Sequence, residues 1–450
     1  MARQLFGTDG VRGVAGEDPL DPATVHALGE ALGEIAPQWE QPAAGIRPSI
    51  VIGADTRESS PWIARQFAGG LARAGLEVRH AGVITTPGVA WLTRTGPFVA
   101  GVMISASHNP YQDNGIKIFG HSGYKLPDEE EHAIEERTFR LLAAGVKPEP
   151  AALVVDQGLD VRYADHLLET AGVSLNNLSM VVDCGNGAAS QIAPGLFRRA
   201  GAQVRAMHCT PDGRNINLNC GALHVDSIRE EVLTSGAGLG VAFDGDADRA
   251  IFVSSSGRVV DGDAVLLIAA RDLLASGALP GHTVVATVMS NLGLEKALGA
   301  LGVRLLRTPV GDKYVLEGML RSGAPLGGEQ SGHIIFGALS TTCDGLLTAL
   351  RIVGIMERSG ATLDELAADL KVYPQRLVNV RVREKKALHD LPAVAAEVRA
   401  CERALGGSGR ILVRFSGTEP LARVMVEALD PRQVEEFSAR IADAIQREIG

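Results

Sequence analysis

A serine and a histidine stand side by side in the stretch ISASHNPYQDNGIKIF, where a hydrophobic run gives way to polar, turn-forming residues. A Ser–His pair suggests hydrolysis, but sequence neighbours are poorly placed for a nucleophile–base contact, and the strand-turn pattern GxSxG is absent. Two interpretations of Ser107 stay open: an ordinary turn serine, or a serine that carries a phosphoryl group. Hydrogen-bond donors for such a group lie nearby in Ser105, His108, Asn109 and Lys117.

Three aspartates alternate in the stretch GVAFDGDADRA, where an apolar run ends. Alternating carboxylates on one loop can converge on a hard cation. An EF-hand would need glycine and glutamate where the chain has Arg249 and Ser255, so a calcium loop of that type is excluded. Asp244, Asp246 and Asp248, with room for one more oxygen, suit Mg²⁺ that also binds a phosphate. A solvated acidic turn is the alternative.

The stretch RFSGTEPLAR has the composition of an anion-binding loop. Arg414 and Arg423 offer planar guanidinium groups that match phosphate. Ser416 and Thr418 add hydroxyls, and Gly417 lets backbone N–H groups approach an anion. A β-hairpin turn is the alternative, since Ser-Gly and Glu-Pro are also turn residues.

A polar loop with the sequence GGEQSGH offers a third set of hydrogen-bonding groups. Glu329 and Ser331 could accept from and donate to neighbouring hydroxyls of a sugar. Taken alone, this stretch reads as a plain loop.

Three stretches of the chain, 49–82, 179–208 and 283–309, share one pattern. Each has an apolar run rich in Val and Ile, a polar or glycine-containing loop, a helix-length segment that ends at a glycine, and a second apolar run. In the first stretch, Ser60 and Pro61 suit the N-cap and first position of the helix. The pattern predicts βαβ units, and its spacing favours three separate α/β domains.

The end of the chain predicts a smaller α+β domain. Two strands precede a final helix, where Asp430 can cap the helix and Pro431 can take its first position. One face of that helix is apolar, through Val434, Phe437, Ile441 and Ile445. We therefore expect an α/β protein with three similar domains on mixed sheets and a smaller α+β domain, around a central cleft. The expected domains are 1–155, 156–253, 254–370 and 371–450.

The bulk composition agrees with such a protein and excludes some functions. The chain has 450 residues, 46% hydrophobic and 21% charged, with 53 glycines and 4% aromatic residues. This favours α/β units with many tight turns. The net charge of −10 argues against a general nucleic-acid binder. The apolar run at 264–270 is too short to span a bilayer, and the N-terminus lacks the apolar core of a signal peptide. The scattered cysteines contain no CxxC pair, so we expect neither a disulfide framework nor a zinc site, and a cytoplasmic location.

Six stretches together resemble the α-D-phosphohexomutase superfamily, in order along the whole chain, and within it the bacterial phosphoglucosamine mutases. They are FGTDGVRG, ISASHNP, PDGRNINLNCGALH, DGDADR, GGEQSGH and RFSGTEP. The resemblance implies a four-domain fold and a phosphoserine at Ser107. Asp244, Asp246 and Asp248 would bind one Mg²⁺ together with an oxygen of that phosphoserine. The reacting end of the substrate would be lined by Arg12, His108, Lys117, Arg249 and His333.

The same resemblance implies the substrate and the rest of its binding site. Glu329 and Ser331 would hold sugar hydroxyls, and the non-reacting phosphate would be held by Arg414, Ser416, Gly417, Thr418 and Arg423. The implied reaction interconverts glucosamine 6-phosphate and glucosamine 1-phosphate on the way to UDP-N-acetylglucosamine. Glucosamine or glucose 1,6-bisphosphate would be the intermediate and activator. Lys117 or His108 would act as general acid or base. The oligomeric state stays open, a homodimer included.

Three rival functions compete with this one. A phosphomannomutase or phosphoglucomutase would use the same residues, although Gln330 and the segment NINLNCG favour the amino sugar by resemblance. A Mg²⁺-dependent phosphatase would not need a loop for a second phosphate, and a non-catalytic binder would not need the reactive positions. The chain departs from the family at Cys343, where glycine is usual, and this substitution predicts a changed backbone angle beside the site.

Overall fold

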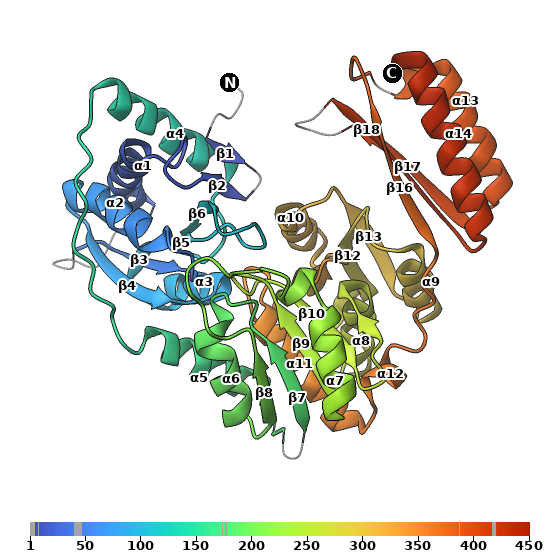
Figure 1. Ribbon diagram of the computed structural model, residues 1–450, viewed down its shortest axis with the longest axis horizontal. Helices are drawn as coiled ribbons and strands as arrows, with labels where there is room; N and C mark the ends of the chain where they lie inside the picture. Colours follow the sequence, from blue (N-terminus) through green and yellow to red (C-terminus); the bar gives the residue numbers. More distant parts are fainter. Residues whose placement is uncertain are drawn as a thin grey trace. The chain divides into compact units, whose positions relative to one another are not determined.

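The computed structural model describes residues 5–7, 9–39, 47–172, 174–175, 178–386, 388–415 and 420–450 (Figure 1). The chain divides into two compact units. The first consists of Met1–Met289 and Leu305–Ala368, and the second of Ser290–Arg304 and Asp369–Gly450.

The first sheet of the first unit has six strands in the order β1-β2-β6-β5-β3-β4. Strand β3 is parallel to β4 and β5, and the other pairs are antiparallel, so the sheet is mixed. The strands are β1 Phe6–Gly7, β2 Gly10–Val14, β3 Ser49–Ala54, β4 Glu77–Val83, β5 Phe98–Ile104 and β6 Asp113–Gly120. The helices of this domain are α1 Pro22–Ile35, η1 Ala36–Gln38, α2 Ser60–Arg73, α3 Thr86–Thr95 and α4 Asp128–Ala143.

Helices cover both faces of this sheet. Successive residues of a strand point to opposite faces. On β3, Ile50 and Ile52 join the apolar core that includes residues of α1, α2 and α4. A Cβ on Gly53 would instead lie 2.4 Å from side-chain atoms of Ile84 and Val89, on the α3 side. The glycine therefore lets α3 approach the second face closely.

The next sheet has five strands in the order β11-β10-β9-β7-β8. Strand β7 is parallel to β8 and β9, whereas β10 is antiparallel to β9 and β11. The strands are β7 Ser179–Asp183, β8 Gln203–Met207, β9 Leu239–Phe243, β10 Ala250–Ser254 and β11 Val259–Val260. The helices are α5 Leu159–Ala171, α6 Ala189–Arg199, η2 Gly221–Leu223 and α7 Asp226–Ser235.

The third sheet has four strands in the order β13-β12-β14-β15. Strands β12 and β14 are parallel, and β15 is antiparallel to β14. The strands are β12 Thr283–Thr287, β13 Arg304–Thr308, β14 Leu326–Gly328 and β15 Ile334–Phe336. The helices are α8 Gly262–Ala275, η3 Pro280–His282, α10 Asp312–Ser322, α11 Gly345–Ser359 and α12 Leu363–Leu366.

The second unit contains an antiparallel sheet in the order β16-β18-β17, with α13 and α14 side by side on it (Figure 1). Its long helices share one apolar core with the sheet. Helix α9 also belongs to this unit, and Asn291 at its N-cap donates to the carbonyl of Tyr373 (2.9 Å). The elements are α9 Leu292–Ala300, β16 Gln375–Arg381, η4 Leu388–Asp390, α13 Pro392–Leu405, β17 Gly409–Phe415, β18 Leu421–Ala428 and α14 Pro431–Ile449.

The predicted fold class is confirmed: three mixed sheets with helices precede a smaller α+β domain. The three βαβ stretches form β3-α2-β4, β7-α6-β8 and β12-α9-β13. Asp430 caps α14, with Pro431 as the first helical residue. Strand β16 and helix α13 enlarge the domain beyond the two strands and one helix expected. The four domain boundaries stay predictions. Among the described residues, no helix is long and apolar enough to cross a membrane.

The prediction that Ser60 is the N-cap of α2 is wrong by one residue. Ser59 is the N-cap, without a side-chain capping bond, and Ser60 begins the helix. The Ser60 hydroxyl instead donates to Asp55 Oδ1 (2.9 Å). The Ser60 hydroxyl therefore binds Asp55, at the end of β3, and does not cap the helix as the local pattern predicted.

We predict that Gly101→Ala destabilises the first domain. A Cβ there would lie 1.9 Å from Thr93 Oγ1, on helix α3. Overfilling of such a contact costs about 1–3 kcal/mol in the free energy of unfolding. Urea unfolding followed by circular dichroism measures it. Gly195→Ala is the matched control, since nothing lies within 4 Å of its Cβ in α6; it should stabilise by about 0.5–1 kcal/mol. Equal effects of the two substitutions would contradict the packing argument.

Candidate active site

The loop that follows β5 holds Ser107 in a strained and fixed conformation. Ser107 is 2% exposed and has a φ of 51°, in the left-handed region that non-glycine residues rarely adopt. Its backbone N–H donates to Ser105 Oγ (2.9 Å), which in turn donates to Asp55 Oδ2 (2.6 Å). Buried Arg57 donates from Nη2 to the carbonyl oxygen of Ser107 (3.0 Å). The N–H and the carbonyl of Ser107 are therefore both held by residues that follow β3.

The loop also meets the second domain closely. Asn217 Nδ2 donates to the Ser107 carbonyl (2.9 Å). A Cβ on Gly245 would lie 2.4 Å from that same carbonyl oxygen, so only glycine allows the approach. The Ser107 hydroxyl donates to Asp244 Oδ2 (2.6 Å). The structure thus joins two stretches that lie more than a hundred residues apart in the sequence.

Three buried carboxylates form the centre of the site, on the loop between β9 and β10. Asp244, Asp246 and Asp248 each offer a ligand atom, and these atoms all lie within 4.8 Å of one another. Burial, with repulsion from Asp248 and Asp246, raises the pKa of Asp244 to about 7. Asp246 Oδ1 is buried without a hydrogen-bond partner. Crowded carboxylates and an unused oxygen are what a divalent cation requires.

A layer of cations surrounds these carboxylates. Lys117, on β6, reaches Asp246 Oδ2 (2.8 Å), Asp248 Oδ2 (3.3 Å) and Asp9 Oδ2 (3.1 Å). Burial lowers the pKa of Lys117, but the neighbouring carboxylates outweigh it and raise the pKa well above its ordinary value. Arg12, on β2, also pairs with Asp9. The ammonium of Lys117 is therefore held charged.

The third domain adds His333 and Glu329 to the same group. His333 Nε2 lies 3.0 Å from Asp248 Oδ1, and its Nδ1 lies 2.9 Å from Glu329 Oε2. Burial and Arg249 lower the pKa of His333, but the two carboxylates overcome them and raise it to about 10. Arg249 Nε lies 3.0 Å from the ring and 3.8 Å from Asp244 Oδ2. The two carboxylates therefore favour the protonated ring, whereas Arg249 opposes protonation.

His108 differs from the other basic groups. Its Nδ1 lies 3.5 Å from Ser107 Oγ. Burial, with Arg249 and Arg12, lowers the pKa of His108 to about 4. Its ring is therefore neutral near pH 7, beside the serine hydroxyl.

The predicted sugar loop follows β14. The Glu329 carboxylate accepts from the N–H of Gly311 (3.0 Å) as well as from His333. Ser331 is exposed, and its hydroxyl lies 3.4 Å from His333 Nδ1. Gln330 donates from Nε2 to Asp261 Oδ2 (3.1 Å), at the N-cap of α8. This contact ties the loop to a helix and occupies the Gln330 amide nitrogen.

A cavity of about 370 Å³ lies beside Arg249 and His333, which contact the aspartates, although neither the three aspartates nor Ser107 line it. Arg12, Arg249, Glu329 and His333 all line it, together with Asp9. Four of the residues that the sequence singled out thus surround one space of a size suited to a small ligand.

The predicted phosphate loop lies in the second unit. Arg414 on β17 and Arg423 on β18 are paired directly across the two strands. Burial, and then Arg423, lower the pKa of Arg414. Like charges opposite each other on neighbouring strands are unfavourable, and an anion bound between them would relieve the repulsion. Ser416, Gly417 and Thr418 lie outside the described residues.

Some residues of the site were not identified from the sequence. Lys125 Nζ bridges Asp9 Oδ1 and Asp312 Oδ2, both at 2.5 Å. Burial raises the pKa of Asp9, but Lys117 and Lys125 outweigh it and hold the pKa well below its ordinary value. Asp9 stands in the quoted stretch FGTDGVRG, where only Arg12 was assigned a role. Asp55 and Arg57, which hold the serine loop, carry no sequence signal beyond their place after a strand.

Two further details concern cysteines. Asp183, His208 and Cys220 form a second group of converging potential ligands. Asp183 accepts from the N–H groups of Gly185 (2.9 Å) and Gly221 (3.0 Å), so its burial is explained by the chain itself. Cys343 is 1% exposed in an apolar cluster, and its backbone is not in the left-handed region. The expected change of backbone angle relative to the family stays a prediction.

Comparisons with known proteins agree with this architecture. Four family profiles of phosphoglucomutase/phosphomannomutase match the chain: alpha/beta/alpha domain I over residues 3–144, domain II over 161–257, domain III over 261–373, and the C-terminal domain over 377–444. The phosphoglucosamine mutase of Solibacter usitatus is 63% identical, and the alignment covers 100% of both chains. That of Koribacter versatilis is 53% identical and covers 100% of this chain and 98% of the relative.

Solved structures share the fold at low identity. A phosphoglucomutase/phosphomannomutase family protein from Burkholderia thailandensis has a TM-score of 0.80 at 22% identity, covering 99% of this chain and 97% of the other. An N-acetylphosphoglucosamine mutase from Aspergillus fumigatus, in complex with GlcNAc-6P and magnesium, has a TM-score of 0.67 at 19% identity, with coverages of 99% and 96%. From the four profiles and the full-length relatives together, the chain belongs to the phosphoglucosamine mutases of the phosphoglucomutase/phosphomannomutase family, which are phosphotransferring isomerases.

Proposed function

We propose that this chain interconverts glucosamine 6-phosphate and glucosamine 1-phosphate, and that Ser107 carries the phosphoryl group. The observation that carries the proposal is the contact between the Ser107 hydroxyl and Asp244 (2.6 Å), inside a buried carboxylate group beside a cavity. A turn serine would not need burial among three acids. The full-length relatives that are named phosphoglucosamine mutases support the choice of sugar.

The reaction is a double transfer. The bond between phosphorus and Ser107 Oγ breaks as a free hydroxyl of the phosphosugar forms a new bond to phosphorus and gives up its proton. The resulting glucosamine 1,6-bisphosphate turns round, and its other phosphate returns to Ser107 while a proton goes to the sugar oxygen. The same bisphosphate, or the glucose analogue, would phosphorylate Ser107 at the start and act as activator.

The carboxylates fit Mg²⁺, since they are hard oxygen donors and Asp246 Oδ1 has no hydrogen-bond partner. Asp244, Asp246 and Asp248 would hold the ion together with a phosphoserine oxygen. When bound, the ion supplies positive charge that stabilises the phosphoryl group during transfer.

The side chains around the serine would have different roles in the proposed reaction. Lys117, locked among three carboxylates, keeps their charge balanced. Arg12 and Arg249, on the cavity wall, would hold the incoming phosphate and counter the charge of the phosphoserine. Of the two candidates for acid–base catalysis, we assign proton exchange at Ser107 Oγ to His108, which faces it at 3.5 Å.

The other end of the substrate would be held by two loops. Glu329 and Ser331 would bind sugar hydroxyls, and His333 fixes the Glu329 carboxylate for that purpose. Arg414 and Arg423, with Ser416, Gly417 and Thr418, would bind the phosphate that does not react. We place the chain in the cytoplasm, where its sugar phosphates would occur and its cysteines, which are free, would stay reduced.

We predict that Ser107→Ala lowers mutase turnover by at least about 10³-fold, because the group that carries phosphate is gone. Turnover of glucosamine 6-phosphate is measured with added glucose 1,6-bisphosphate, and intact mass reports phosphorylation. The wild-type chain should gain one phosphate at Ser107, and the variant none. Ser122→Ala, an exposed serine of the same domain, is the control. A Ser107→Ala variant with near-normal turnover would show that another residue carries the phosphate.

We predict that Asp246→Asn weakens Mg²⁺ binding by at least about tenfold, since one ligand charge is removed. Calorimetric titration with MgCl₂ measures the affinity without reference to turnover. Asp165→Asn serves as control, because this aspartate is 47% exposed and pairs with Arg199. EDTA should abolish turnover in the wild type, and Mg²⁺ should restore it. Unchanged Mg²⁺ affinity in Asp246→Asn would refute the proposed ion site.

We predict that the wild-type chain turns over glucosamine 6-phosphate at least about tenfold faster, as kcat/KM, than glucose 6-phosphate or mannose 6-phosphate. Discrimination of this size corresponds to about 1.4 kcal/mol, the worth of one or two hydrogen bonds to the amino group. Inorganic phosphate is assayed in the same reactions. Comparable rates on glucose 6-phosphate would point to the phosphoglucomutase rival, and phosphate release that outpaces isomerisation would point to a phosphatase.

A further inference from the structure

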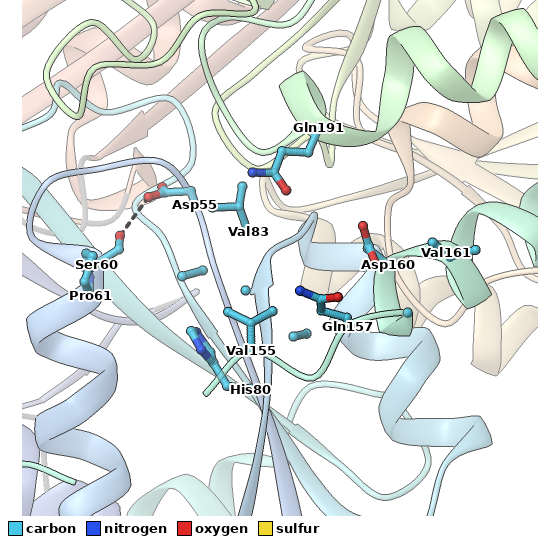
Figure 2. Close-up of a pocket in the computed structure, with 14 residues that line it drawn as sticks. Asp55, Ser60, Pro61, His80, Val83, Val155, Gln157, Asp160, Val161 and Gln191 are labelled. Carbon is cyan, nitrogen blue, oxygen red and sulfur yellow. Dashed lines mark hydrogen bonds between the residues drawn. The ribbon is translucent and has the colours of Figure 1, made fainter. Parts of the chain in front are cut away.

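A second and larger cavity, of about 630 Å³, is lined in part by Asp55, which holds the serine loop through Ser105 (Figure 2). It opens at the carboxyl ends of the parallel strands β3 and β4, where open α/β sheets commonly bind ligands. None of its lining residues lines the cavity beside the carboxylates. The proposed mutase reaction makes no use of it.

The chain segment between the first two domains forms one wall of this cavity. Val155 pairs with His80 as an extension of the sheet, and the N–H of Asp156 donates to the His80 carbonyl (2.7 Å). Gly82 allows this approach, since a Cβ there would lie 3.1 Å from Val155 Cγ1. Gln191, on α6 of the second domain, lines another side. Ligand sites occur preferentially at such domain junctions.

The lining is polar at several points but carries no cationic side chain. Among the described residues, those that line it include neither Lys, Arg, Phe, Tyr nor Trp. Gln157, Gln191 and Asp160 contribute two amides and a carboxylate, and Figure 2 shows them with Val83 and His80 around one space. His80 Nδ1 has no hydrogen-bond partner, and burial lowers the pKa of His80. A neutral imidazole, amides and a carboxylate are suited to an uncharged hydrogen-bonding ligand.

The apolar part of the lining further limits the kinds of ligand that would fit this cavity. Val83, Val155 and Val161 present aliphatic surface without an aromatic ring. A flat heterocycle can pack between apolar side chains of this kind. Amide and carboxylate groups can pair with the donors and acceptors along the edge of a base. A phosphate would meet two carboxylates, Asp55 and Asp160, and no compensating cation.

We propose that this cavity is a regulatory site for a nucleobase or nucleoside without phosphate, and that its occupation changes the behaviour of Ser107. The connection runs through Asp55. This carboxylate lines the cavity and accepts from Ser60 Oγ (2.9 Å) and Ser105 Oγ (2.6 Å). Ser105 Oγ in turn accepts from the N–H of Ser107 (2.9 Å). A ligand that shifts Asp55 acts two hydrogen bonds away from Ser107, and a ligand that competes for Ser60 acts three hydrogen bonds away.

The test uses the full chain and four probes: adenosine, guanosine, cytidine and uridine, each up to millimolar concentration. Binding is measured by ligand-observed NMR and by calorimetry, which do not depend on mutase activity. Val161→Trp would fill the cavity from a side chain that is 51% exposed. Val154→Trp is the matched control, 84% exposed and outside the lining. Gln191→Ala removes one of the two amides.

We expect at least one nucleoside to bind the wild type and Val154→Trp alike. Its affinity should fall by at least about tenfold in Val161→Trp and by several-fold in Gln191→Ala, the latter matching the loss of one hydrogen bond. Saturation with that nucleoside should change the rate at which phosphorylated Ser107 loses its phosphate to water. Absence of binding by all four probes, or binding that survives Val161→Trp, would overturn the site. Binding with an unchanged rate of phosphate loss would overturn its regulatory role.

Discussion

The structure of the site depends on gathering three buried carboxylates and one partly buried carboxylate close together. Asp9, Asp244, Asp246 and Asp248 come from two domains and gather around Lys117 and its neighbours. An uncompensated buried charge costs several kcal/mol, so such a group is stable only if cations and hydrogen bonds are built in with it. Two of these cations, Arg12 and Arg249, also line the neighbouring cavity, whereas Lys117 is enclosed by carboxylates.

A second constraint is the left-handed backbone at Ser107 and at Ala247, in the serine loop and the aspartate loop respectively. Conformations of this kind cost about 1–3 kcal/mol each and persist only where surrounding contacts fix them. At Ser107 those contacts are two hydrogen bonds to the carbonyl and one to the N–H. Arg57 makes one of these bonds directly, and Asp55 holds Ser105, which accepts from the Ser107 N–H. A pocket that touches Asp55 is thus connected to the Ser107 N–H by two hydrogen bonds.

The two compact units contribute different chemistry. The first unit contains the serine, the carboxylates and the sugar loop, on the loops that follow strands of three successive sheets. The second unit presents two arginines side by side on neighbouring strands. Burial lowers the pKa of Arg414, and Arg423 lowers it further, because like charges on neighbouring strands repel each other.

Local sequence patterns were enough to predict much of the fold. The periodicity at 49–82, 179–208 and 283–309 gave strand, helix and strand because apolar spacing and terminal glycines act over a few residues. The capping of α14 by Asp430 is local for the same reason. Ser60 was misplaced because its hydroxyl serves Asp55, a partner outside the helix. Strand β16 and helix α13 were missed.

The sequence alone determined which residues have the chemistry: a serine beside a histidine, three alternating aspartates, and arginines around a glycine. Residue types and short spacings are written along the chain, and no folding is needed to see them. Only the tertiary structure decided that Ser107 meets Asp244, that Lys117 is enclosed by Asp9, Asp246 and Asp248, and that Lys125 and Arg57 support the site. Those contacts join residues far apart in sequence, and the burial that sets their charges exists only once the sheets have packed together.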